Sequence, residues 1–116
     1  MIAADTLTVE AFERLLADES VPVVHRALWL LLWISDKKVL DLLALQVADA
    51  DAVRPPPGSP YAERADALLT ALAADRASGP LFANGPRTLT WDEAVRTAAS
   101  KGVALHTFRT SGKHHR

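Results

Sequence analysis

Residues 27–34, ALWLLLWI, constrain the fold more than any other part of the chain, because all eight are apolar. A membrane span needs ~20 such residues, so this run is too short to cross a bilayer. We therefore predict a helix over residues 22–34 that Pro22 opens, whose later part is apolar all round and which is the central, buried helix. The chain has 116 residues, 49% of them hydrophobic, and this is enough for one core. We expect a single domain over residues 1–116.

Amphipathic helices are predicted on either side of this segment. Residues 8–18 carry an apolar stripe and have Thr8 as the capping residue at their start. Residues 37–46 carry a second stripe, for which either Ser35 or Asp36 is the expected cap. Each stripe indicates a helix with one buried face.

Two further helices are predicted in the second half of the chain. Residues 61–77 are rich in alanine and carry an apolar face that ends before a glycine. Residues 88–102, TLTWDEAVRTAASKG, contain the clearest helix pattern of the chain. Thr90 and Glu93 have the spacing of a capping box, and Gly102 provides the stop.

The three tryptophans are expected to be packing residues. Trp29 and Trp33 are one helical turn apart within the apolar run, which favours core packing or a subunit contact over base stacking. Trp91 lies just inside the capped helix and is expected to pack as well.

The remaining segments predict loops and little strand. Residues 52–60 contain three consecutive prolines, which lack the N–H that regular structure needs, so a loop is expected there. Residues 80–85, PLFANG, are typical of a short extended piece that ends in an Asn-Gly turn. Residues 103–105 are expected to be extended, and the pattern does not decide whether a helix begins at Arg109. The predicted fold class is mostly α with little or no β-sheet.

Charge is distributed unevenly along the chain. Residues 1–100 carry nine Lys and Arg against fourteen Asp and Glu, a net charge of −5, whereas residues 101–116 carry four basic residues and no acid, a net +4. A basic end on an acidic body favours an anionic partner for that end, with Lys113 among the candidate contacts. The alternative is a solvated basic tail over residues 109–116.

The chain contains no cysteine, and its first residues lack the basic-then-apolar layout of a signal peptide. Disulfides and Cys-based metal sites are thus excluded, and a cytoplasmic protein without a membrane partner is expected. His106, His114 and His115 lie close together in sequence, but adjacent histidines without a neighbouring acid or cysteine are not a spacing typical of a metal site. We expect neither a metal nor a cofactor.

Three stretches, in this order, resemble the catalytic domain of the tyrosine recombinases, or phage integrases. LTVEAFERLLA is similar to the opening helix of that family. ALWLLLWISDKKVLDLLALQVADAD is similar to its buried helix, its Thr-Gly-Leu-Arg-x-x-Glu-Leu segment and its Leu-x-x-x-Asp-x-Asp closure. GPLFANGPRTLTWDEAVRTAASKGVALHTFRTSG is similar to its Leu-Phe pair, turn, helix and His-x-x-Arg box. The stretches cover about residues 6–112, and the resemblance implies a reduced recombinase-like catalytic core.

In that family a tyrosine attacks a DNA phosphodiester, while two arginines and a His or Lys neutralise the charge on the phosphate oxygens. The resemblance places Lys38 at the first arginine, Asp41 at an acidic support position, and His106 with Arg109 at the His-x-x-Arg box. It therefore implies that Lys38, His106 and Arg109 share a phosphate pocket. The alternative is that Arg109 lies near a helix start and pairs with a carboxylate such as Asp41.

Several features of the family site do not match. Lys38 lacks the bidentate fork of arginine, and Asp36 adds a negative charge where the family has glycine. The hairpin that carries a catalytic lysine in the family aligns with residues 53–60, where VRPPPGSP contains no lysine and cannot pair as a hairpin. Tyr61, the only tyrosine, precedes the His-x-x-Arg box and is not expected to be the nucleophile, which the family alignment puts beyond residue 116.

These features predict a non-catalytic, recombinase-like protein that binds DNA or a recombination complex and regulates it. The alternative is a protein-interaction module that kept the fold and lost DNA binding, and the small net charge of −1 favours it. A recombinase, another protein or a second copy of the chain are the protein partners considered. A remnant without a retained function and an unrelated small helical protein are further alternatives.

Overall fold

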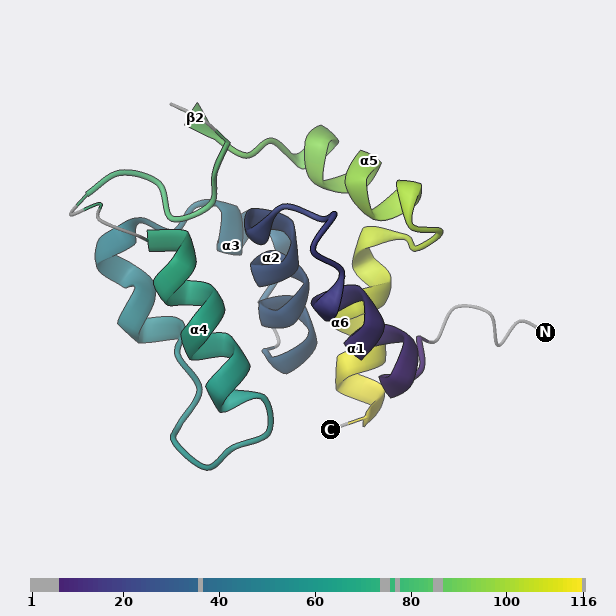
Figure 1. Ribbon diagram of the computed structural model, residues 1–116. Helices are drawn as coiled ribbons and strands as arrows, with labels where there is room; N and C mark the ends of the chain where they lie inside the picture. Colours follow the sequence, from purple (N-terminus) through teal and green to yellow (C-terminus); the bar gives the residue numbers. More distant parts are fainter. Residues whose placement is uncertain (1–6, 36, 74–75, 77, 85–86, 116) are drawn as a thin grey trace.

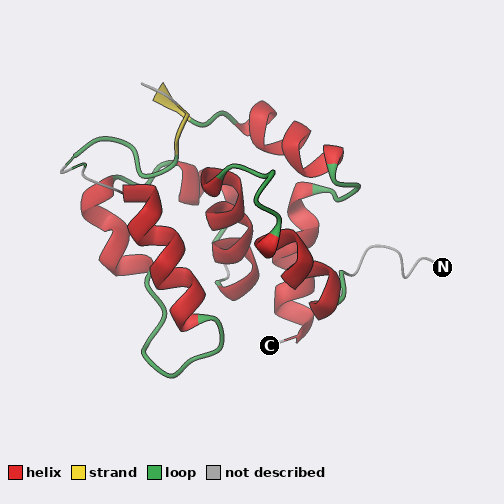
Figure 2. Ribbon diagram, in the orientation of Figure 1, coloured by secondary structure: helices red, strands yellow, loops and turns green. Residues whose placement is uncertain are grey.

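Helices make up most of the protein, and the strands among the described residues form a single two-residue pair (Figure 2). The mostly α fold class is confirmed. The computed structural model describes residues 7–35, 37–73, 76, 78–84 and 87–115. In chain order the elements are α1 (Val9–Ala17), α2 (Val23–Ile34), α3 (Val39–Leu43), the 3₁₀ helix η2 (Val47–Val53), α4 (Ala62–Ala73), β1 (Ala83–Asn84), β2 (Arg87–Thr88), α5 (Trp91–Ser100) and α6 (Leu105–His115).

The apolar run forms the central helix, as its composition predicts. Every residue of α2 from Ala27 to Trp33 is buried. α2 packs on α1, α3, α4 and α6, and its largest contacts are with α6 and α4. Figure 1 shows α2 between α4 on one side and α1 with α6 on the other. A helix segment that is apolar all round is stable in water only when its neighbours surround it in this way.

Helix α1 begins where the sequence predicts. The hydroxyl of Thr8 accepts a hydrogen bond from the backbone N–H of Ala11 at 3.1 Å and so caps the helix. The preceding residue, Leu7, joins α1 to α6: its N–H donates to the Ser111 hydroxyl at 2.7 Å, and its carbonyl accepts from Nε2 of His115 at 3.0 Å. These two bonds hold the start of α1 against the last described helix.

The third helix is shorter than residues 37–46. α3 ends at Leu43 because the following residues form tertiary hydrogen bonds that a helix would forbid. Leu45 accepts from the N–H of Leu81 at 2.9 Å, and the N–H of Val47 donates to Gly79 at 2.8 Å. Lys38 is the N-cap residue rather than Ser35, while Asp36 lies outside the described residues.

The proline-rich segment is a loop, but it begins later than residue 52 because η2 continues to Val53. It connects η2 to α4 at the lower edge of Figure 1. The Arg54 side chain, at the start of the loop, pairs with Asp51 at 2.9 Å and with Asp66 of α4. Helix α4 starts at Ala62 and is described to Ala73. Residues 74, 75 and 77 of the predicted helix 61–77, and Gly85 of the predicted Asn-Gly turn, lie outside the described residues.

The last described residues form a helix, which corrects two sequence predictions. α6 begins at Leu105, so residues 103–105 are not extended throughout. Residues 109–115 of the predicted basic tail belong to α6, and Arg116 lies outside the described residues. The helix forms because its apolar face is buried: Leu105 and Phe108 are 3% and 0% exposed.

An aromatic cluster fills the space between α1, α2 and α6. The ring of Phe12 stacks on Trp33 with centroids 3.9 Å apart, and Trp29 stacks on Phe108 at 4.9 Å. Trp29 and Trp33 are thus core residues, as predicted. Gly112 of α6 lies directly against the backbone of Trp33: an added Cβ would sit 2.6 Å from the Cα and carbonyl carbon of Trp33 and nearer still to its oxygen.

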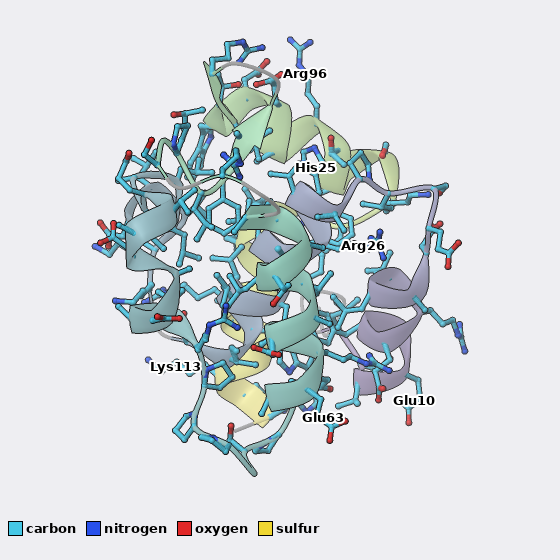
Figure 3. All side chains as sticks on the ribbon, turned by 60° about the vertical axis from the view of Figure 1, so that its left-hand side comes forward. Glu10, His25, Arg26, Glu63, Arg96 and Lys113 are labelled. Atoms are coloured by element: carbon cyan, nitrogen blue, oxygen red, sulfur yellow. The ribbon has the colours of Figure 1, made fainter. Side chains whose placement is uncertain are left out.

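His25 is a buried titratable residue of α2 whose side chain lies against α5. It is 7% exposed, and its Nε2 lies 3.3 Å from the hydroxyl of Thr97 (Figure 3). Its Nδ1 has no hydrogen-bond partner within the described part of the chain. Burial lowers the pKa of His25 below its ordinary value of 6.5, although the negative charge of Glu93 opposes this effect. The imidazole is therefore neutral in the folded protein near pH 7.

This burial predicts that acid weakens the fold. The unfolded chain takes up the His25 proton at a higher pH than the folded chain does. The free energy of unfolding should be fully retained above about pH 6.5 and should decline as the pH falls from there through the lowered pKa. Urea titrations at a series of pH values measure this decline. His25→Gln, which does not titrate, should show a smaller decline over the same interval, and an equal decline would contradict this assignment.

Candidate functional site

Four residues that the sequence places in one site line a single pocket. Lys38, Asp41, His106 and Arg109 surround a hollow of about 390 Å³. The other residues of its lining are Val39, Leu40 and Trp91. Residues 38–41 and residues 106–109 come from segments far apart in the sequence, so the fold brings them together.

Three helices position the side chains. Lys38 is the N-cap residue of α3, Asp41 lies on the first turn of that helix, and Trp91 is the first residue of α5. His106 and Arg109 are three residues apart on α6 and therefore project from one helix face. Because α5 packs against both α3 and α6, it joins the two halves of the pocket. Lys38, Asp41 and His106 are exposed, and Arg109 is half-buried.

A network of hydrogen bonds fixes the start of α5, the helix that Trp91 opens. The predicted capping box is present: the Thr90 hydroxyl accepts from the N–H of Glu93 at 3.1 Å, and the Glu93 carboxylate accepts from the N–H of Thr90 at 3.0 Å. The Arg87 guanidinium binds both oxygens of that carboxylate, at 2.8 and 3.0 Å. This guanidinium and the Thr90 N–H lower the pKa of Glu93 to about 2. The helix start is thus fixed by a bidentate ion pair and a reciprocal cap.

Two exposed apolar side chains belong to the same pocket. Leu40 is 62% exposed and Trp91 is 49% exposed. They are the two large hydrophobic side chains that the described residues leave most open to water. The prediction that Trp91 is a packing residue is therefore only half right, because about half of its surface is open to water. The sequence pattern leaves Leu40 off the apolar stripe of residues 37–46, but it does not indicate that Leu40 borders a pocket.

Lys113 does not line the pocket. It is exposed on α6, one turn beyond Arg109, and its side chain is labelled in Figure 3. The i, i+4 spacing places it on the same side of the helix as Arg109. Lys113 therefore flanks the pocket at most, on the far side of Arg109 along α6.

Tyr61 and His115 lie at a different pocket. Together with Trp33 and residues of the proline loop, they line a hollow of about 420 Å³. Tyr61 adopts a φ of 66°, which is uncommon for a residue with a side chain. Burial raises the pKa of its hydroxyl, and the Glu13 carboxylate adds to this effect. The tyrosine therefore stands apart from the four predicted site residues.

The three C-terminal histidines do not converge. His106 lines the pocket of Lys38 and Arg109, which we call the cationic pocket. The His115 ring stacks on Trp33 with centroids 5.4 Å apart, and the His114 ring contacts His115 edge-on at 5.1 Å. Within the described ranges, no three His, Asp or Glu side chains are grouped as metal ligands would be. Across the same residues, no helix has both the length and the hydropathy that a bilayer crossing demands.

The lining of the pocket suits an oxyanion. It contains two permanent cations, an imidazole and one carboxylate, and no hydroxyl or thiol is found among the described lining residues. Arginine can bind two oxygens of a phosphate at once, whereas lysine supplies a single charge. Comparison of the chain with protein-family models, with curated proteins and with solved structures found no significant match. The recombinase relationship stays a prediction that rests on the quoted motifs.

Proposed function

We propose that this protein is a non-catalytic, tyrosine-recombinase-like module that binds DNA through a backbone phosphate and thereby regulates a recombination complex. One observation carries the proposal: Lys38, His106 and Arg109 line one pocket, although two of them come from α6 and one from α3. A cytoplasmic setting is part of the same proposal.

The chemistry of these three residues supports a phosphate ligand. A phosphodiester has two unesterified oxygens, which match the planar fork of Arg109, and Lys38 adds a second positive charge. His106 adds a donor from the same helix face as Arg109. Asp41, on the first turn of α3, supplies the one negative charge of the lining and limits how much anionic charge the pocket tolerates.

The residues of the pocket also support the absence of catalysis. Strand cleavage by this chemistry needs a hydroxyl nucleophile within reach of the phosphorus. The described lining contains none, and Tyr61 lines the other hollow. Lys38 also stands where the family has an arginine. Because an ammonium cannot bind two phosphate oxygens as a guanidinium does, it should stabilise the charge of a transition state less than an arginine would.

The binding test uses a short fluorescent DNA duplex, titrated with protein at low and at moderate salt. We expect the affinity for DNA to fall as the salt concentration rises. Arg109→Ala should weaken binding and should reduce the steepness of log K against log salt concentration by about 1. Lys38→Arg should strengthen DNA binding, because a guanidinium can bind two phosphate oxygens at once. Arg96→Ala is the matched control: it removes the same charge from α5, where Arg96 forms only a solvent-exposed pair with Asp92 at 2.9 Å (Figure 3).

The result separates the two candidate functions. If Arg109→Ala and Arg96→Ala weaken duplex binding equally, the attraction is diffuse and the phosphate pocket is wrong. If the wild-type protein does not bind at low salt, the protein-interaction module is the better explanation. The exposed Leu40 and Trp91 favour that second candidate, since apolar side chains grouped at one site are typical of protein contacts. Its partner is then a recombinase, another protein or a second copy of the chain.

A further inference from the structure

The indole of Trp91 is the feature of the cationic pocket that phosphate binding leaves unexplained. It is 49% exposed at the start of a capped helix, in the same lining as Lys38 and Arg109. A duplex phosphate lies on the outside of the double helix, where it needs only cations and N–H donors. Neither Trp91 nor Leu40 would contribute to such a contact, and exposing both side chains to water is unfavourable.

We propose that the pocket binds one unpaired nucleotide of single-stranded DNA, with its base stacked on Trp91 and its phosphate held by Arg109 and Lys38. This inference rests on the proposed function and assigns its substrate class. An indole offers a flat π-face, and every unpaired base has a matching face. Leu40 borders the same hollow and would cover the apolar edge of the stacked base.

The size and the rigidity of the pocket fit this ligand. Its volume of about 390 Å³ falls in the ~300–1,000 Å³ range of small-molecule sites. The cap that Thr90, Glu93 and Arg87 form fixes the backbone from which the Trp91 side chain projects, so the helix start would not have to be ordered when a base arrives. In a duplex the bases are already stacked on one another, and their faces are closed to Trp91.

The single carboxylate of the lining argues against an acidic peptide as the ligand. A peptide with several carboxylates would bring like charges to Asp41, which costs free energy. A nucleotide carries its negative charge at the phosphate end only, and its base presents N–H donors that a carboxylate can accept. Separate cationic, apolar and acceptor groups in one hollow therefore match a nucleotide better.

The experiment compares labelled oligothymidine with a duplex of equal length at one salt concentration. Trp91→Ala should weaken single-strand binding by about fivefold to 100-fold and should leave duplex binding nearly unchanged. Trp91→Phe, which keeps a π-face, should retain most of the affinity. Arg96→Ala should change neither. Because Trp29 and Trp33 are buried, the oligonucleotide should quench the fluorescence of Trp91, and this quenching should be absent in Trp91→Phe.

Each alternative outcome has a distinct meaning. If Trp91→Ala leaves single-strand binding unchanged while Arg109→Ala weakens both DNA forms, the stacking inference is overturned and the phosphate proposal stands. If Arg109→Ala and Trp91→Ala both leave DNA binding unchanged, both proposals fail. Tighter binding of polyglutamate than of oligothymidine at the same salt would replace the nucleotide with an acidic peptide. Loss of secondary structure in Trp91→Ala, seen by circular dichroism, shifts the test to the Trp91→Phe fluorescence measurement, in which retained quenching would refute the assignment to Trp91.

Discussion

Gly112→Ala should be strongly destabilising, although alanine is the better helix former. An added Cβ would lie 2.6 Å from the Cα and the carbonyl carbon of Trp33, which are backbone atoms that cannot turn aside. The helices α2 and α6 would have to separate along their largest contact. Overpacking of a core typically costs ~1–3 kcal/mol, and a clash with backbone should reach or exceed the upper end of that range.

Helix propensity and core packing predict opposite changes in stability for Gly112→Ala. Helix propensity alone predicts that replacing a helical glycine with alanine stabilises a protein by about 1 kcal/mol. Urea unfolding of Gly112→Ala should instead give a clearly lower midpoint than the wild type. Lys113→Ala, at the neighbouring and exposed position, should stay within about 0.5 kcal/mol of the wild type. A Gly112→Ala protein as stable as the wild type would mean that α2 and α6 do not approach this closely.

Phe12→Ala should produce the second large effect. Phe12 is 0% exposed and stacks on Trp33 with an angle of 5° between the ring planes. It also contacts Tyr61 edge-on, with centroids 5.7 Å apart, and Phe108 at 6.0 Å. One side chain thus joins α1 to α2, to α6 and to the residue before α4. Removing a buried phenylalanine typically costs ~3–5 kcal/mol, a large share of the stability of a small domain.

Thermal and urea unfolding, followed by circular dichroism, measure this loss. The near-ultraviolet signal should also weaken, since the Phe12–Trp33 stack contributes to the fixed environment of the indole. Arg14→Ala is the control on the same helix, because Arg14 is exposed and changing it removes no core contact. If Phe12→Ala were no less stable than Arg14→Ala, the aromatic cluster could not be the centre of the core.

Local patterns predicted the elements that depend on local forces. Thr8 and the Thr90–Glu93 box satisfy backbone N–H groups within one turn of chain, so their effect is visible in sequence. The apolar run predicted a buried helix at α2, because eight consecutive apolar residues are unfavourable in water. The early end of α3 was not predictable, since Leu45 forms its hydrogen bond with Leu81, far along the chain. The start of α6 was missed because burial, and not propensity, stabilises that helix.

The candidate site was predicted only through motif resemblance. Nothing in the local pattern links residues 38–41 to residues 106–109, yet these segments share one pocket. Leu40 and Trp91 could not be found in this way, because they meet only where α3 and α5 pack together, and a local pattern does not show which helices pack. Lys113 was included on charge alone, and charge does not say which side chains border a hollow.

The pairing of α2 with α6 has a consequence for how the chain reaches its fold. α2 is made before α6, its largest partner, and the described helices α3, α4 and α5 are made between them. Contacts between such distant segments require closure of a long loop and slow the search for the native state. Until α6 emerges, the tryptophan-bearing face of α2 stays open to other nascent chains, so aggregation during translation should be the main hazard for this protein.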